Sequence, residues 1–164
     1  MLTNYSVGNY KLFLKKMIEF SLQVEPRIIS SIIPELEKIF AKSHEIEDFS
    51  STVLNLDDSE LEETWIDGLK EDVKSDRIAL AKLLKSARLP YGRVEVEDSD
   101  VDDLLRGLTE IRFTIRKTSL KMITDEEIEN GLPNLKSANS KVKIGYFSYL
   151  LVAEIQERLI QEIS

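Results

Sequence analysis

The chain contains no cysteine and a single histidine among its 164 residues. Without cysteine it cannot form disulfides, thiolate nucleophiles, or Cys-ligated zinc and iron-sulfur sites. The histidine, His44, lies in a serine-rich stretch and has no glutamate three residues before it, as helical di-iron sites require. We therefore expect no metal site and no cofactor.

Long apolar runs are also missing. No stretch approaches the roughly eighteen uncharged apolar residues of a membrane-spanning helix, and the first residues lack the pattern of a secretory leader. The lack of cysteine fits a reducing compartment. These features predict a cytoplasmic protein with no role in the membrane.

A surplus of basic residues is likewise absent, since 22 Lys and Arg face 30 Asp and Glu and give a net charge of -8. The basic residues are scattered among acids, so the chain would repel a nucleic-acid backbone. Phosphate loops, dinucleotide glycine fingerprints, calcium loops and serine elbows do not occur. We expect no nucleic-acid partner and no enzymatic activity.

Helical periodicity dominates the sequence that is present. Apolar residues recur at helical spacing in residues 26–42, 57–87, 100–120, 124–131 and 143–163. Pro34 predicts a kink or two short helices, and the second segment is compatible with one helix or with a break near residues 70–74. Ser99 with Asp102 and Thr124 with Glu127 have the spacing of capping boxes.

The N-terminal region has the two-residue alternation of strands. It is clear in residues 17–24 and weaker in residues 9–14, which predicts a small antiparallel ribbon. Residues 41–56 and 88–100 are polar or rich in turn residues and predict surface loops. The expected fold is a single domain, 1–164, of the all-α class: a helical bundle over 25–164 with a short N-terminal antiparallel β-ribbon within 1–24.

Four segments together resemble a known family. They are "IEFSLQVEPRIISSIIPELEKIF", "WIDGLKEDVKSDRIALAKLL", "LLRGLTEIRFTIRKTSLKMITDEE" and "YFSYLLVAEIQERLI". Their order and spacing are similar to those of the bacterial domain of unknown function 2017 family, from about Met17 onward. The resemblance implies a helical core after a short strand, no established catalytic residues, and genes often beside that of the Clp protease adaptor ClpS.

Three arginines, Arg106, Arg112 and Arg116, lie at helical spacing in the third segment. A carboxylate on the apolar side of the preceding helix would be costly unless paired, and arginine suits this because its planar fork can bind a carboxylate twice. We expect the two helices to pack antiparallel and to place Asp76 near Arg112. The candidates for this structural ion-pair network are Asp72, Asp76, Arg77, Glu110, Arg112 and Arg116.

Two functional alternatives use the same residues. A carboxylate-based hydrolase would need Asp72, Asp76 and Glu110 to line one open pocket with Arg112, whereas an anion-binding sensor would use Arg106 and Arg112. Arg106 has acids one turn away, which favours the structural interpretation.

The last helix is apolar around much of its circumference, so one side is expected to be deeply buried or to meet a partner. The candidate interaction residues are Tyr146, Phe147, Tyr149 and Leu150. The aromatic Trp65 is expected in the core. The sequence thus predicts a non-enzymatic regulatory or protein-interaction module that binds a protein partner or forms a homodimer.

Overall fold

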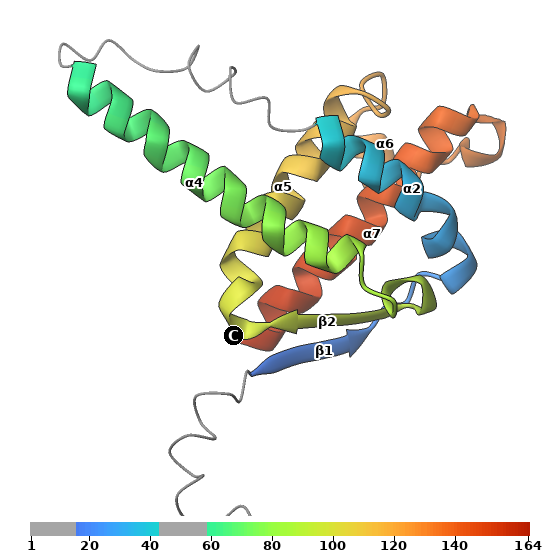
Figure 1. The fold of residues 1–164 in the computed structure, drawn as a ribbon. Coiled ribbons are helices and arrows are strands. Elements are labelled where there is room, and N and C mark those ends of the chain that lie inside the picture. Colours follow the sequence, from blue (N-terminus) through green and yellow to red (C-terminus); the bar gives the residue numbers. More distant parts are fainter. Residues whose placement is uncertain (1–15, 43–58) are drawn as a thin grey trace, which may run out of the picture.

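The computed structural model describes residues 16–42 and 59–164, and for residues 42, 59–70 and 72 it describes the backbone alone. Within these ranges the chain forms five α-helices and one two-stranded antiparallel sheet, which lies at one side of the helices (Figure 1). In chain order the main elements are β1 (Met17–Ser21), α2 (Pro26–Lys42), α4 (Ser59–Leu84), β2 (Arg93–Glu97), α5 (Val101–Lys117), α6 (Asp125–Glu129) and α7 (Ser140–Ile163). A mostly helical fold with a short antiparallel sheet is confirmed.

The partner of the first strand differs from the one expected. β1 pairs with β2, so that Ile18 lies opposite Val96 and Phe20 opposite Val94, and all four side chains are buried. The prediction of a loop over residues 88–100 is therefore wrong for its central part. The apolar alternation of "RVEVE" spans only five residues between turn and acidic segments, which made the strand hard to recognise. The predicted partner over residues 9–14 lies outside the described residues.

Helix α2 is continuous across Pro34, so two short helices do not form. Proline removes one intrahelical hydrogen bond. The apolar face compensates for this loss because it is buried on both sides of the proline, through Ile29, Ile32, Leu36 and Ile39. The loop predicted over residues 41–56 lies almost entirely outside the described residues.

Helix α4 is one helix without a break near residues 70–74, and it packs across α5 (Figure 1). The two helices lie close together at Gly107, where an added Cβ would lie 3.3 Å from the carbonyl oxygen of Asp76. Glycine thus lets the two backbones approach closely. Figure 1 shows that the first half of α4 extends beyond the rest of the body, and the buried residues of α4 begin at Val73 among its described side chains.

Helix α7 forms the centre of the core through Leu151, Ile155 and Leu159. Its first turns pass close to the segment after α5, since a Cβ on Gly145 would lie 2.4 Å from the Cβ of Ser119. The deep burial expected for this helix is confirmed.

The two capping boxes have different outcomes. Thr124 and Glu127 form both hydrogen bonds of the box at the start of α6. The box expected at Ser99 and Asp102 does not form, because a short 3-10 turn over residues 98–100 precedes α5 and Asp100 takes the cap position without a side-chain bond.

Candidate functional site

The three arginines of α5 point to three different environments. Arg106 faces α4, and its Nε donates to the Asp76 carboxylate at 3.1 Å and 3.4 Å. Its Nη2 also pairs with Asp103 one turn earlier on α5. Asp76 is only 6% exposed, so a cation beside it offsets much of its desolvation cost. Arg106 is therefore balanced by two carboxylates.

The expected pairing of Asp76 with Arg112 is wrong. Positions 106 and 112 are six residues apart, and at 3.6 residues per turn they lie on clearly different sides of α5. The close contact of the helices at Gly107 brings Arg106 to Asp76, whereas Arg112 faces α7. The principle of an arginine neutralising a buried carboxylate between these helices holds, with a different arginine.

Arg112 donates to neutral acceptors. Its Nη1 bonds the Oε1 of Gln156 at 2.9 Å and its Nη2 bonds the hydroxyl of Tyr149 at 2.9 Å. Gln156, which is 7% exposed, donates in turn to the carbonyl of Leu105 and to the hydroxyl of Thr109. This network joins α5 to α7. Among the described side chains, no carboxylate lies within 4 Å of the Arg112 guanidinium.

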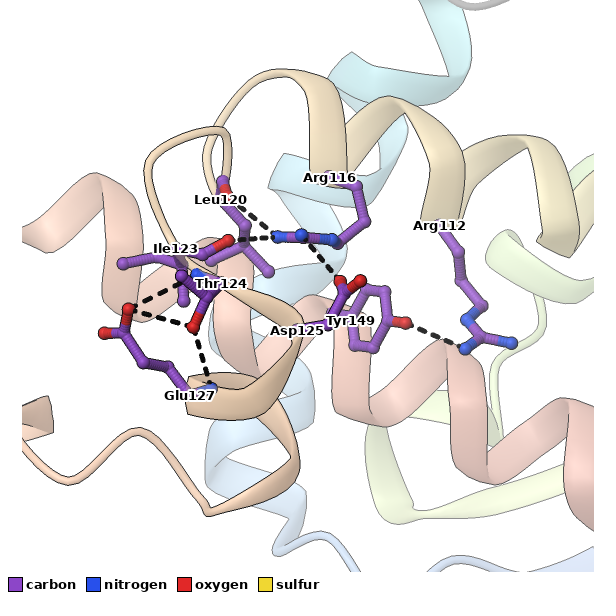
Figure 2. Close-up of polar contacts among 8 residues, drawn as sticks. All are labelled: Arg112, Arg116, Leu120, Ile123, Thr124, Asp125, Glu127 and Tyr149. Carbon is purple, nitrogen blue, oxygen red and sulfur yellow. Dashed lines mark hydrogen bonds and ion pairs between the residues drawn. The ribbon is translucent and has the colours of Figure 1, made fainter.

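Arg116 stabilises the turn that follows α5. Its Nη1 donates to the carbonyls of Leu120 and Ile123 at 2.8 Å and 3.0 Å, and its Nη2 pairs with Asp125 at 2.8 Å. Figure 2 shows this guanidinium at the inside of the turn, beside the capping box at Thr124, while Arg112 meets Tyr149 separately. The role of Arg116 is to hold a backbone turn and the start of α6.

The remaining ion-pair candidates do not join a common site. The guanidinium of Arg77 lies over the Phe40 ring at 4.5 Å, and Glu110 is exposed without an ion pair to any described residue. The side chain of Asp72 lies outside the described side chains. Because Asp76 is buried against Arg106 and Glu110 is exposed, these groups do not line the one open pocket that the hydrolase alternative requires.

The candidate interaction residues of α7 pack largely on the protein itself. Tyr146 is buried in the core, whereas Phe147, Tyr149 and Leu150 are half-buried and pack against it. The prediction that Tyr146 contributes to an exposed surface is therefore wrong, because consecutive apolar residues of α7 are shared among α2, α5 and the segment after α5. The side chain of Trp65 lies outside the described side chains.

Two residues of α7 that were not among the predicted site residues bind the backbone between β1 and α2. The Glu154 carboxylate accepts from the backbone N–H groups of Gln23 and Val24, and Arg158 donates to the carbonyl of Ser21 at 2.9 Å. Their four-residue spacing was the available signal, since it puts both on one helix face. The strand and the bundle are thus fastened together by α7.

A cavity of about 110 Å³ lies between β2, α4 and the start of α5. Ligand pockets usually measure roughly 300–1,000 Å³, so this cavity is too small for a cofactor. At its rim, Lys82 binds Asp100 at 3.0 Å, and this hydrogen bond raises the pKa of the lysine. None of the predicted site residues lines the cavity.

Within residues 16–42 and 59–164 no three His, Asp or Glu side chains come together as metal ligands. The described helices also include none that combines the length and apolarity needed to cross a membrane. Comparisons with models of protein families, with curated proteins and with solved structures found no match. The resemblance to the domain of unknown function 2017 family accordingly stays a prediction.

Proposed function

We propose that the protein is a non-enzymatic interaction module that binds another protein through the first half of α4. The observation that carries this proposal is the extension of that half beyond the body of the molecule in Figure 1. Most helical stability in proteins comes from the packing of an apolar face, so this half of the 26-residue helix gains stability when another surface packs on it.

The sequence of this half supports a helix that binds along one side. Leu61, Trp65 and Leu69 recur every four residues, which is the spacing of one helix face. Residues 59–72 also contain six acids and one lysine. A partner that presents basic groups around an apolar strip would complement this composition. The same acids oppose direct pairing with α4 of a second copy, which favours a different protein over a homodimer formed through this helix.

The use of the arginines agrees with a role in binding rather than catalysis. Arg106 and Arg116 are occupied by carboxylates and carbonyls of the scaffold. Of the carboxylates proposed for hydrolysis, Asp76 is buried against Arg106, whereas Glu110 is exposed without an ion pair to a described residue. We also propose a cytoplasmic location, which the lack of cysteine supports. A regulatory role near Clp proteolysis is what the family resemblance adds, by association alone.

A photo-crosslinking amino acid at position 61 tests the proposal in cells of the source organism. We expect discrete protein adducts from position 61, and fewer from a matched position on the exposed face of α6, Glu126. Replacing Trp65 by Ser in the same chain should weaken the adducts, because it interrupts the apolar face. Equal labelling from positions 61 and 126, or adducts that persist in Trp65→Ser, would contradict the proposal.

A further inference from the structure

The charges around the three arginines of α5 are unequal. Arg106 contacts two carboxylates and Arg116 contacts one carboxylate and two carbonyls, whereas both acceptors of Arg112 are neutral. Removing a guanidinium from water without a counter-charge costs free energy. Arg112 is half-buried and its bound acceptors are neutral, so an anion from solvent would balance its positive charge.

The network fixes the orientation of this guanidinium. Gln156 holds Nη1, while Tyr149 accepts from Nη2 and its ring lies 4.8 Å from the guanidinium carbon. Gln156 cannot rotate freely, because its amide nitrogen is bound to Leu105 and Thr109 of α5. The donors are therefore pre-organised, which lowers the entropy cost of binding.

Several donors of this network have no acceptor among the described residues. A guanidinium carries five N–H groups, of which two are used in the bonds to Gln156 and Tyr149. The Nε group is buried without a partner, and one hydrogen on each of Nη1 and Nη2 is left over after the bonds to Gln156 and Tyr149. The Tyr149 hydroxyl accepts from Arg112, and its own proton is still available for donation.

We propose that Arg112 and Tyr149 bind a small oxyanion, a carboxylate or phosphate group, at the junction of α5 and α7. Two oxygens of the anion accept from the Nη groups, and the Tyr149 hydroxyl donates a further hydrogen bond. Arginine and oxyanions match in this planar, forked geometry. Arg106, the other arginine of the sensor hypothesis, is excluded from the site because Asp76 and Asp103 already occupy it.

The net charge of -8 repels anions at long range, although salt screens this repulsion beyond about 8 Å at physiological ionic strength. We therefore expect millimolar binding, and the test uses the full chain in 0.15 M salt. Sodium phosphate and sodium acetate are each titrated against sodium chloride at constant ionic strength. Scanning calorimetry follows the melting temperature and NMR follows the side-chain N–H signal of Arg112.

As its concentration rises, phosphate, acetate or both should raise the melting temperature and shift the Arg112 NMR signal until both responses saturate, whereas chloride should cause neither change. Which anion saturates identifies the group that the site prefers. Tyr149→Phe keeps the ring and removes the hydroxyl donor, so the half-saturating concentration should rise about tenfold, as expected for one hydrogen bond to a charged group. Arg112→Gln should abolish saturation if it folds.

Lys117→Gln is the matched control, because it removes one positive charge from an exposed lysine on the same helix. It should leave the half-saturating concentration unchanged. A response that does not saturate, that chloride reproduces, or that Tyr149→Phe leaves unaltered would overturn the proposal. These outcomes do not bear on binding through α4, so the two proposals fail separately.

Discussion

The pairing of Asp76 with Arg106 should be the strongest side-chain interaction between α4 and α5. We predict that a double-mutant cycle of Asp76→Asn and Arg106→Met gives a coupling of about 1.5–2 kcal/mol. A hydrogen bond to a charged group makes a net contribution of roughly 1.5–3 kcal/mol to the free energy of unfolding. The lower end applies because the Arg106 side chain is 53% exposed and is screened by solvent, although Asp76 is buried.

Equilibrium unfolding in urea, followed by far-ultraviolet circular dichroism, measures the four free energies of unfolding. Arg106→Met alone should lower the melting temperature by about 3–8 °C, since a loss of about 1.5–2 kcal/mol is expected and 1 kcal/mol corresponds to roughly 2–4 °C at this chain length. The methionine keeps the apolar stem of the side chain, so the loss reports chiefly on the guanidinium.

Two further cycles serve as controls. Asp103 with Arg106 is an exposed pair one turn apart, for which we expect about 0.3–0.5 kcal/mol. Asp76 with Arg112 should show no coupling beyond measurement error, because the two side chains are not paired. A coupling of Asp76 with Arg106 no larger than that of the exposed pair, or a large coupling of Asp76 with Arg112, would refute this account of the helix interface.

Other substitutions test the close contacts, the sheet rim and the cap. Gly145→Ala should cost about 1–3 kcal/mol in unfolding measurements, because its Cβ would clash with Ser119 at 2.4 Å. The hydrogen bond to Asp100 raises the pKa of Lys82 from its ordinary value of 10.5. The stability that this ion pair contributes is therefore fully present below pH 10.5 and is lost as the pH rises through the raised pKa. The destabilisation caused by Asp100→Asn should therefore shrink in alkaline unfolding experiments. Thr124→Ala should cost about 1 kcal/mol and increase amide exchange in α6, and unchanged exchange would argue against the cap.

The sequence was informative where a local pattern determines the structure. The capping residues Thr124 and Glu127 are three apart and bind each other and the adjoining backbone, so this box could be predicted from its spacing. The same spacing at Ser99 and Asp102 gave no box, because a short 3-10 turn precedes α5 there. The helices α2, α5 and α7 were likewise visible from their apolar periodicity, because a core of this size buries one face of each. Interruption by Pro34 was outweighed by burial on both sides of it.

Features that depend on how distant segments meet could not be predicted in the same way. The β2 strand is recognisable mainly through its pairing with β1, because five residues in which two valines alternate with two glutamates give a weak pattern. The choice between Arg106 and Arg112 depends on where α4 crosses α5. Gly107 was the available signal, since a glycine within a helix often marks a close approach to another backbone.

The crossing at Gly107 also connects the structural and functional interpretations of the arginines. By bringing Asp76 to Arg106, it uses one guanidinium for the scaffold and directs Arg112 toward α7, where the acceptors are an amide and a phenol. Two arginines of one helix therefore have different roles: Arg106 forms a neutralised ion pair with Asp76, whereas Arg112 is an oriented cation bound to neutral acceptors. The way in which α4 packs on α5 decides which of the two arginines can bind an anion.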